Sequence, residues 1–280
     1  MRPSQWIKNG FVGMPLVFSG RLLDFEDSVK TMGIFLMFCL IASTTYIIND
    51  YMDMEKDKAH PVKKNRPLAS GEMSPATAFV LAGALIISSF LLGGAIRASW
   101  WCYALLAIYL MLHIVYSIRL KELVIVDVMA ISAGFLLRVF SGAAVISVPV
   151  SSWLILCTFT VAAFLALGKR RHEVIVLCDD ACCHRPVLRH YSMGLLDQLL
   201  QVVTTSTFIF YCLYVVYGGG SHTEKMMVTI PLVAYGIFRY LYLIYHKQDG
   251  GSPTALLLND LPLLVCLTIW LTTCIAIIYT

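Results

Sequence analysis

Charged residues are scarce in this sequence. Only 14% of its 280 residues are charged and 59% are hydrophobic, whereas about a quarter of the residues in a soluble domain are usually charged. Long polar connections, internal repeats and low-complexity tracts are also missing. No segment between the apolar runs is long enough to form a soluble domain of its own. These absences exclude a soluble globular protein and a repeat array.

Apolar runs fill most of the chain instead. A run of about 20 apolar residues is long enough to cross the hydrocarbon core of a bilayer, which is about 30 Å thick. The fold class is therefore predicted to be all-α, a polytopic membrane protein that forms a single domain over residues 1–280. We expect cap loops at about 50–74, 118–123 and 169–193. The nine predicted spans are 8–20, 31–49, 77–96, 98–117, 124–146, 152–167, 195–217, 226–245 and 261–279.

Lysine and arginine are distributed unevenly between the two sides of the predicted membrane. If the N-terminus is cytoplasmic, most of the 21 lie on that side, and only Arg21, Lys30, Arg97 and Lys225 lie outside. This bias predicts a cytoplasmic N-terminus in the plasma (inner) membrane. We expect no cleavable signal peptide, because the first residues lack an apolar core that ends in a small-residue site. The net charge of +4 then indicates attraction to anionic lipid, not to nucleic acid.

Four side chains with oxygen donors follow the second predicted span. Asn49, Asp50, Asp53 and Asp57 fall on one helical face about 100° wide. Carboxylates this close repel one another unless a cation lies among them, and hard oxygen donors suit Mg²⁺. An EF-hand is excluded because its loop glycine and terminal glutamate are missing. The alternative is a solvated helix end that marks the membrane boundary.

A second polar constellation follows two spans later, in the segment YSIRLKELVIVD. Asp127 lies just inside a span, where an aspartate is costly unless it faces the bundle interior, so we predict that it holds a second Mg²⁺. Tyr116 and Lys121 are predicted to contact a phosphate. Arg66, in the basic and turn-rich segment after the acids, is predicted to do the same. The alternative is a hairpin whose charges only define the interface.

Basic residues near or inside the spans are further candidates. Arg138 lies about 16 Å deeper than Asp127 on the same helical face. It is predicted either to bind a phosphate or to pair with an acid as a structural clamp. Lys8 and Asn9 lie near the start of the first span, where they could reach an anionic ligand.

The segment GKRRHE closes the sixth predicted span. Lys169 and Arg170 are predicted to bind phosphate, or Lys169 pairs with Glu173 one helical turn away. Near the end of the chain, we expect Arg239 to extend toward the membrane interface. Asp260 is expected at the start of the last helix.

The segment CDDACCH lies in a predicted cytoplasmic loop, where thiols stay reduced. Thiolates and imidazole are suitable zinc ligands, but the spacing here matches no common zinc ribbon. We therefore expect an ordinary loop. The residues concerned are Cys178, Cys182, Cys183 and His184.

The segments NDYMDMEKD, HPVKKNRPLASG and YSIRLKELVIVD together resemble the UbiA superfamily of intramembrane prenyltransferases. The superfamily pattern is Asn-Asp-x-x-Asp-x-x-x-Asp on one helix, with a Tyr/Lys/Asp motif two spans later. The resemblance implies about nine transmembrane helices around a central cavity that opens sideways to lipid, under a cytoplasmic cap. It also implies that Mg²⁺ is bound by the two acidic motifs and holds a pyrophosphate.

The segments RPSQWIKN, GFLLRVFSGA, GKRRHE and GGSPTALLLND resemble the polyprenyl-phosphate phosphoribosyltransferase branch of that superfamily. This implies transfer of 5-phosphoribosyl from phosphoribosyl pyrophosphate (PRPP) to a polyprenyl phosphate, with release of pyrophosphate. The implied catalytic residues are Asp53, Asp57, Lys121 and Asp127, and the implied metal ligands are Asn49, Asp50, Asp53, Asp57 and Asp127. The residues implied to bind substrate phosphates are Lys8, Arg66, Tyr116, Lys121, Arg138, Lys169 and Arg170.

Two other functions are compatible with parts of this pattern. A UbiA-type aromatic prenyltransferase would use a polyprenyl diphosphate as donor with the same metal and pyrophosphate apparatus. The PRPP interpretation requires sites for two further phosphates, and the many bases on the cytoplasmic side favour it. A lipid transporter or flippase would need polar groups through both leaflets, whereas the polar groups here concentrate on one side.

Overall fold

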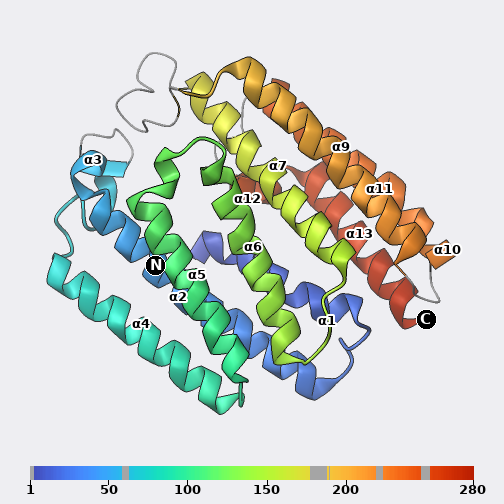
Figure 1. The fold of residues 1–280 in the computed structure, drawn as a ribbon, viewed down its shortest axis with the longest axis horizontal. Coiled ribbons are helices and arrows are strands. Elements are labelled where there is room, and N and C mark those ends of the chain that lie inside the picture. The colour runs from blue at the N-terminus through green and yellow to red at the C-terminus, as the bar shows by residue number, and fades with distance from the viewer. Residues whose placement is uncertain (1–2, 59–62, 177–187, 189, 219–222, 247–252) are drawn as a thin grey trace. The chain divides into compact units, whose positions relative to one another are not determined.

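The computed structural model describes residues 3–58, 63–176, 188, 190–218, 223–246 and 253–280. In this part of the chain every regular element is helical (Figure 1). Eight of the described helices are long and apolar enough to cross a membrane. The prediction of an all-α, polytopic membrane protein is confirmed. The chain divides into two compact units, which are described separately. Unit 1 contains Met1–Ala130 and Leu137–Pro149, and unit 2 contains Ile131–Leu136 and Val150–Thr280.

Unit 1 is organised around α2, which packs against α4 and α5 (Figure 1). Its long helices are α2 (Phe25–Met52), α4 (Pro75–Ala95), α5 (Trp100–Ile118) and α6 (Val126–Val145), and the segment Ile131–Leu136 of α6 belongs to unit 2. Side-chain caps define two of the starts, because Asp24 accepts a hydrogen bond from the Asp27 N–H and Ser74 accepts one from the Thr77 N–H. Such caps satisfy N–H groups that have no partner within the helix.

The N-terminal segment differs from the prediction of a span at 8–20. It forms a 3-10 helix, η1 (Pro3–Gly13), followed by the short α1 (Met14–Phe18). Gly10 and Gly13 are poor helix formers, and Pro15 has no N–H to donate to a preceding helical turn. These residues explain why the segment is not one continuous α-helix. The remaining short elements of unit 1 are α3 (Met54–Lys58), η2 (Lys63–Asn65) and η3 (Leu120–Glu122).

The η1 segment packs tightly against α6. A Cβ added to Gly142 of α6 would lie 2.0 Å from the carbonyl oxygen of Val12 in η1, so only glycine fits there. Val12 itself is completely buried, in a core that includes Phe38 of α2 and Tyr109 of α5. The N-terminal segment is therefore a packed part of unit 1.

This contact gives a first prediction. We expect Gly142→Ala to lower stability by about 1–3 kcal/mol, because the new methyl group must displace the η1 backbone. The measurement is the melting temperature of the purified protein in detergent. Gly83→Ala in α4 is the matched control, since its Cβ would meet nothing within 4 Å, and alanine is the better helix former. Equal melting temperatures for the two variants would contradict the tight packing of η1 on α6.

Unit 2 contains the remaining long helices. They are α7 (Ser152–Val176), α9 (Met193–Tyr217), α11 (Ile230–His246) and α13 (Leu261–Tyr279), joined by the shorter α10 (Thr223–Met226), η5 (Met227–Thr229) and α12 (Pro253–Asn259). Within the unit α7 packs against α9, and α11 packs against α13. The sixth predicted span, 152–167, was too short, because α7 continues through the basic segment to Val176. Lys169 and Arg170 therefore lie on a helix.

Arg239 and Asp260 form an ion pair in unit 2. The Arg239 Nε and one terminal nitrogen donate to the two Asp260 carboxylate oxygens at 3.0 and 2.7 Å. The extension of Arg239 toward the membrane interface stays a prediction, and the structure adds that its guanidinium pairs with this acid. Asp260 also accepts a hydrogen bond from the Leu263 N–H and caps α13, as expected for a helix start.

The outer faces of the helices are apolar. On α4, Val80 and Leu91 are 74% and 71% exposed, and Leu261 on α13 is 69% exposed. Large apolar side chains that face outward from a polytopic helical protein are expected to contact lipid. This agrees with membrane insertion of both units.

Candidate active site

The acidic stripe predicted from the sequence, Asn49, Asp50, Asp53 and Asp57, lies where α2 ends and α3 begins. Asp53 is the C-cap of α2, and its N–H donates to the Asn49 carbonyl at 2.9 Å. The Asp57 N–H donates to the Asp53 carbonyl at 2.8 Å. Helical hydrogen bonding thus continues across the junction, which keeps Asn49, Asp53 and Asp57 at helical spacing.

Asp53 is held by both of its carboxylate oxygens. Lys121 Nζ lies 2.6 Å from Oδ1, and Asn49 Nδ2 donates to Oδ2 at 3.1 Å. The hydroxyl of Ser117 in α5 donates to Asn49 Oδ1 at 3.1 Å. Two motifs that are far apart in the sequence therefore meet here, through Asp53 and Lys121. Ser117 was not among the site residues predicted from the sequence, although it lies four residues before Lys121.

Arg66 pairs with both Asp50 and Asp57. One terminal nitrogen of Arg66 lies 3.1 Å from Asp50 Oδ1 and 2.5 Å from Asp57 Oδ2. The Asp57 side chain is only 5% exposed, so its charge is largely removed from water and depends on a positive partner. Arg66, which was predicted to contact a phosphate, thus pairs with two acids of the stripe in this structure.

Asp127 is completely buried in the first turn of α6. The chain enters that helix through Ile125, which has φ +68° and ψ −44°. The Val126 N–H donates to the Val124 carbonyl at 2.7 Å, which closes a three-residue turn. A β-branched residue with positive φ is strained. The strain lies between Lys121 and Asp127, the two predicted site residues of this hairpin.

Arg138 lies in a buried polar network. Its Nε donates to Asn9 Oδ1 at 2.8 Å, and one terminal nitrogen donates to the Tyr109 hydroxyl at 2.8 Å. Asn9 also donates to the Cys39 sulfur at 3.3 Å, and its side chain is completely buried. Arg138 therefore ties η1 to α5 and α6 through two neutral acceptors. Lys8, the neighbour of Asn9, is half-buried.

Three bases of the GKRRHE segment are ion-paired within unit 2. Lys169 Nζ lies 3.8 Å from a Glu173 oxygen, and Arg170 pairs with the other oxygen of the same carboxylate. Arg170 is 1% exposed, whereas the Lys169 side chain is 39% exposed. Arg171 Nε donates to Asp197 Oδ1 at 2.7 Å. The pairing of Lys169 with Glu173 that the spacing allowed is thus present.

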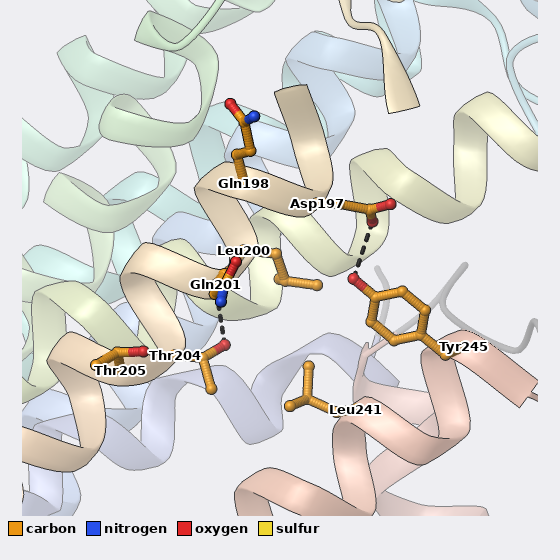
Figure 2. A pocket seen from close by; sticks show the side chains of 8 residues that line it. All are labelled: Asp197, Gln198, Leu200, Gln201, Thr204, Thr205, Leu241 and Tyr245. Atoms are coloured by element: carbon orange, nitrogen blue, oxygen red, sulfur yellow. Dashed lines mark hydrogen bonds between the residues drawn. The ribbon is translucent and has the colours of Figure 1, made fainter. Parts of the chain in front are cut away.

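A groove of about 300 Å³ lies beside α9 and α11 of unit 2 (Figure 2). At one end Asp197 accepts a hydrogen bond from the Tyr245 hydroxyl at 2.9 Å, in addition to the one from Arg171. The groove contains none of the residues predicted for the site. Its lining residues are Asp197, Gln198, Leu200, Gln201, Thr204, Thr205, Leu241 and Tyr245.

The chemistry of the acidic stripe fits Mg²⁺. Its donors are carboxylate and amide oxygens, which are the ligands that Mg²⁺ prefers. Among the described residues, no three acidic, histidine or cysteine side chains are gathered closely enough to hold a metal ion. Lys121 and Arg66 instead neutralise the acids. The cysteine-rich segment at residues 178–184 lies outside the described part of the chain.

The sequence model of the UbiA prenyltransferase family matches residues 15–263, so the chain belongs to this family of membrane-embedded transferases. It is similar to the decaprenyl-phosphate phosphoribosyltransferase of Mycolicibacterium smegmatis, at 31% identity over 100% of this chain and 91% of the relative. The enzyme of the same name from Corynebacterium glutamicum is 27% identical over 100% of this chain and 85% of its own length.

A solved structure supports the fold assignment. The UbiA homologue from Archaeoglobus fulgidus, bound to GPP and Mg²⁺, matches with a TM-score of 0.73 at 18% identity. The match covers 100% of this chain and 98% of that chain. The fold is therefore UbiA-like, as the two motifs predicted.

Proposed function

We propose that this protein transfers 5-phosphoribosyl from PRPP to the phosphate of a polyprenyl phosphate and releases pyrophosphate. The observation that carries the proposal is the likeness, over the whole chain, to proteins named decaprenyl-phosphate phosphoribosyltransferase. In this reaction the bond from ribose C1 to the pyrophosphate oxygen breaks. A bond from C1 to an oxygen of the acceptor phosphate forms. The acceptor phosphate is already anionic near neutral pH, so it needs little help from a base.

The acidic stripe is the proposed metal site. Asn49, Asp50, Asp53 and Asp57 supply oxygen ligands, and Asp127 is proposed to complete the set. Bound there, Mg²⁺ would neutralise negative charge on the pyrophosphate leaving group. Metal use is supported by the donor chemistry and by the Mg²⁺ in the solved Archaeoglobus fulgidus homologue.

The bases next to the stripe are proposed to bind the donor pyrophosphate. Lys121 and Arg66 now lie against Asp53, Asp50 and Asp57. With a cation held by the carboxylates, Lys121 and Arg66 would be able to turn their donors to the phosphate oxygens. Tyr116 is proposed to add a hydroxyl donor.

The remaining predicted bases serve the other two phosphates in this proposal. They are Lys8, Arg138, Lys169 and Arg170, and the polyprenyl tail is assigned to the apolar interior and the surrounding lipid. The segments at about 50–74 and 118–123 are proposed to cap the site. The third expected cap loop, at about 169–193, begins on α7, and most of its remainder lies outside the described residues. The bias of lysine and arginine supports a cytoplasmic N-terminus and active site in the plasma membrane.

An assay with defined substrates tests the proposal. Purified protein in nanodiscs receives labelled PRPP, a polyprenyl phosphate and Mg²⁺, and the lipid fraction is analysed by mass spectrometry. We expect a polyprenyl-phosphate-linked ribose 5-phosphate and one pyrophosphate per product. Prenylation of an aromatic acid from a polyprenyl diphosphate, with no labelled lipid from PRPP, would replace this function by aromatic prenyl transfer.

A further inference from the structure

His113 in α5 has an unexplained buried nitrogen. Its Nε2 is shielded from solvent, and no described residue forms a hydrogen bond with it. Buried polar atoms are nearly always paired, so an orphan inside a span requires a specific explanation. Ring contacts hold the imidazole in place, with centroid distances of 4.3 Å to Tyr109 and 6.4 Å to Tyr116.

The surroundings of His113 are positively charged. Lys8 of η1 and Arg138 of α6 both lie within electrostatic range of its ring. Arg138 is oriented by its bonds to Asn9 and to the Tyr109 hydroxyl, one helical turn from His113. Side chains from η1, α5 and α6 thus bring two cations and an unpaired imidazole nitrogen into one region of unit 1.

This region is connected to the acidic stripe by α5. Tyr109, His113, Tyr116 and Ser117 lie within about 100° of one helical face. Ser117 donates to Asn49 of the stripe, and His113 is one turn, about 6 Å along the helix, deeper than Ser117. Along α5, a pyrophosphate at the stripe and a phosphate beside His113 would therefore lie about one helical turn apart.

We propose that Lys8, His113 and Arg138 form a subsite for a phosphate monoester, in which His113 donates its Nε2–H to a phosphate oxygen. Two cations and a neutral N–H donor are the groups that bind such an anion. The identity of the occupant rests on the proposed function. It is the 5-phosphate of PRPP or the phosphate of the polyprenyl acceptor, which share the same chemistry.

The test replaces His113 by phenylalanine, which keeps the ring but removes the donor, and by glutamine, which keeps a donor. We expect His113→Phe to raise KM about tenfold for one substrate with little change in kcat. His113→Gln should raise it less. A purely structural role would instead lower the amount of folded protein and leave KM unchanged. The exposed His246→Phe is the matched control.

The two candidate phosphate groups predict different changes in KM. A higher KM confined to PRPP assigns the subsite to the 5-phosphate, and one confined to the polyprenyl phosphate assigns it to the acceptor. Unchanged KM values for both substrates in folded, active His113→Phe would overturn the subsite.

Binding of radiolabelled inorganic phosphate to the purified protein is measured in parallel, because it does not depend on turnover. His113→Phe should weaken this binding about tenfold relative to His246→Phe. If the wild type transfers no ribosyl group but shows this difference, the proposed function fails and the subsite stands. Equal phosphate binding by the two variants would reject the subsite whatever the reaction is.

Discussion

Replacing Asp53 or Asp57 by asparagine will reduce turnover by about a thousandfold or more while the protein stays folded and inserted in the membrane. Asp53 accepts hydrogen bonds through both oxygens, and the asparagine amide can still accept one from Lys121. The local fold should therefore survive. The negative charge that holds a cation is lost, and the leaving pyrophosphate then has less positive charge to stabilise it.

The measurement is initial rate against Mg²⁺ concentration, together with the melting temperature in detergent. Glu55→Gln is the matched control, since Glu55 lies next to the stripe but is exposed and pairs with Lys58. This control should keep nearly the rate of the wild type. Near-normal rates for both Asp53→Asn and Asp57→Asn would refute the metal assignment. A large loss of rate in Glu55→Gln would show that any loss of negative charge near the stripe lowers the rate, whether or not the residue binds metal.

The stripe was predictable because its geometry is local. Asn49, Asp53 and Asp57 are four residues apart on a helix, so their common face follows from the helical period alone. Lys121 could be placed on the same side of the membrane by counting spans. That it contacts Asp53 depends on how α5 packs against α2, which no local rule gives.

The N-terminal segment was predicted less well because tertiary contacts determine its conformation. Hydropathy predicts a span at 8–20. In the structure this segment packs its Val12 backbone against Gly142 of α6 and buries Asn9. From the sequence, Arg138 was predicted to contact either a phosphate or an acid. The structure instead gives it two neutral acceptors. Asn9 and Tyr109 come from distant parts of the chain, and no spacing connects them to Arg138.

His113 was detectable as a candidate from the sequence. A histidine inside an apolar span is costly and marks a functional candidate. The structure adds that its Nε2 is unpaired and lies in a cationic region. The end of α7 was predicted too early for a different reason. The apolar run ends at the first charges of GKRRHE, whereas the helix continues through these charged residues, which form ion pairs.

Replacing Arg138 by methionine should cause a large loss of stability. The substitution leaves the buried Asn9 Oδ1 and the Tyr109 hydroxyl without the donors they now have, at a cost of about 1–3 kcal/mol for each group. The side chain also ties η1 to α6, so its loss should loosen the segment that carries Lys8. Arg138→Lys should rescue only part of the loss, because one ammonium cannot reproduce both directions of the guanidinium.

The measurement is a double-mutant cycle on melting in detergent, with Arg138→Met, Asn9→Leu and the double variant. We expect the double variant to lose about 1–3 kcal/mol less than the sum of the single variants, because the two residues share one buried hydrogen bond. The exposed Arg119→Met controls for loss of a positive charge in the same unit. Strictly additive losses would mean that Asn9 and Arg138 act independently. The anchoring of η1 would then rest on the packing of Val12 against Gly142 and not on this bond.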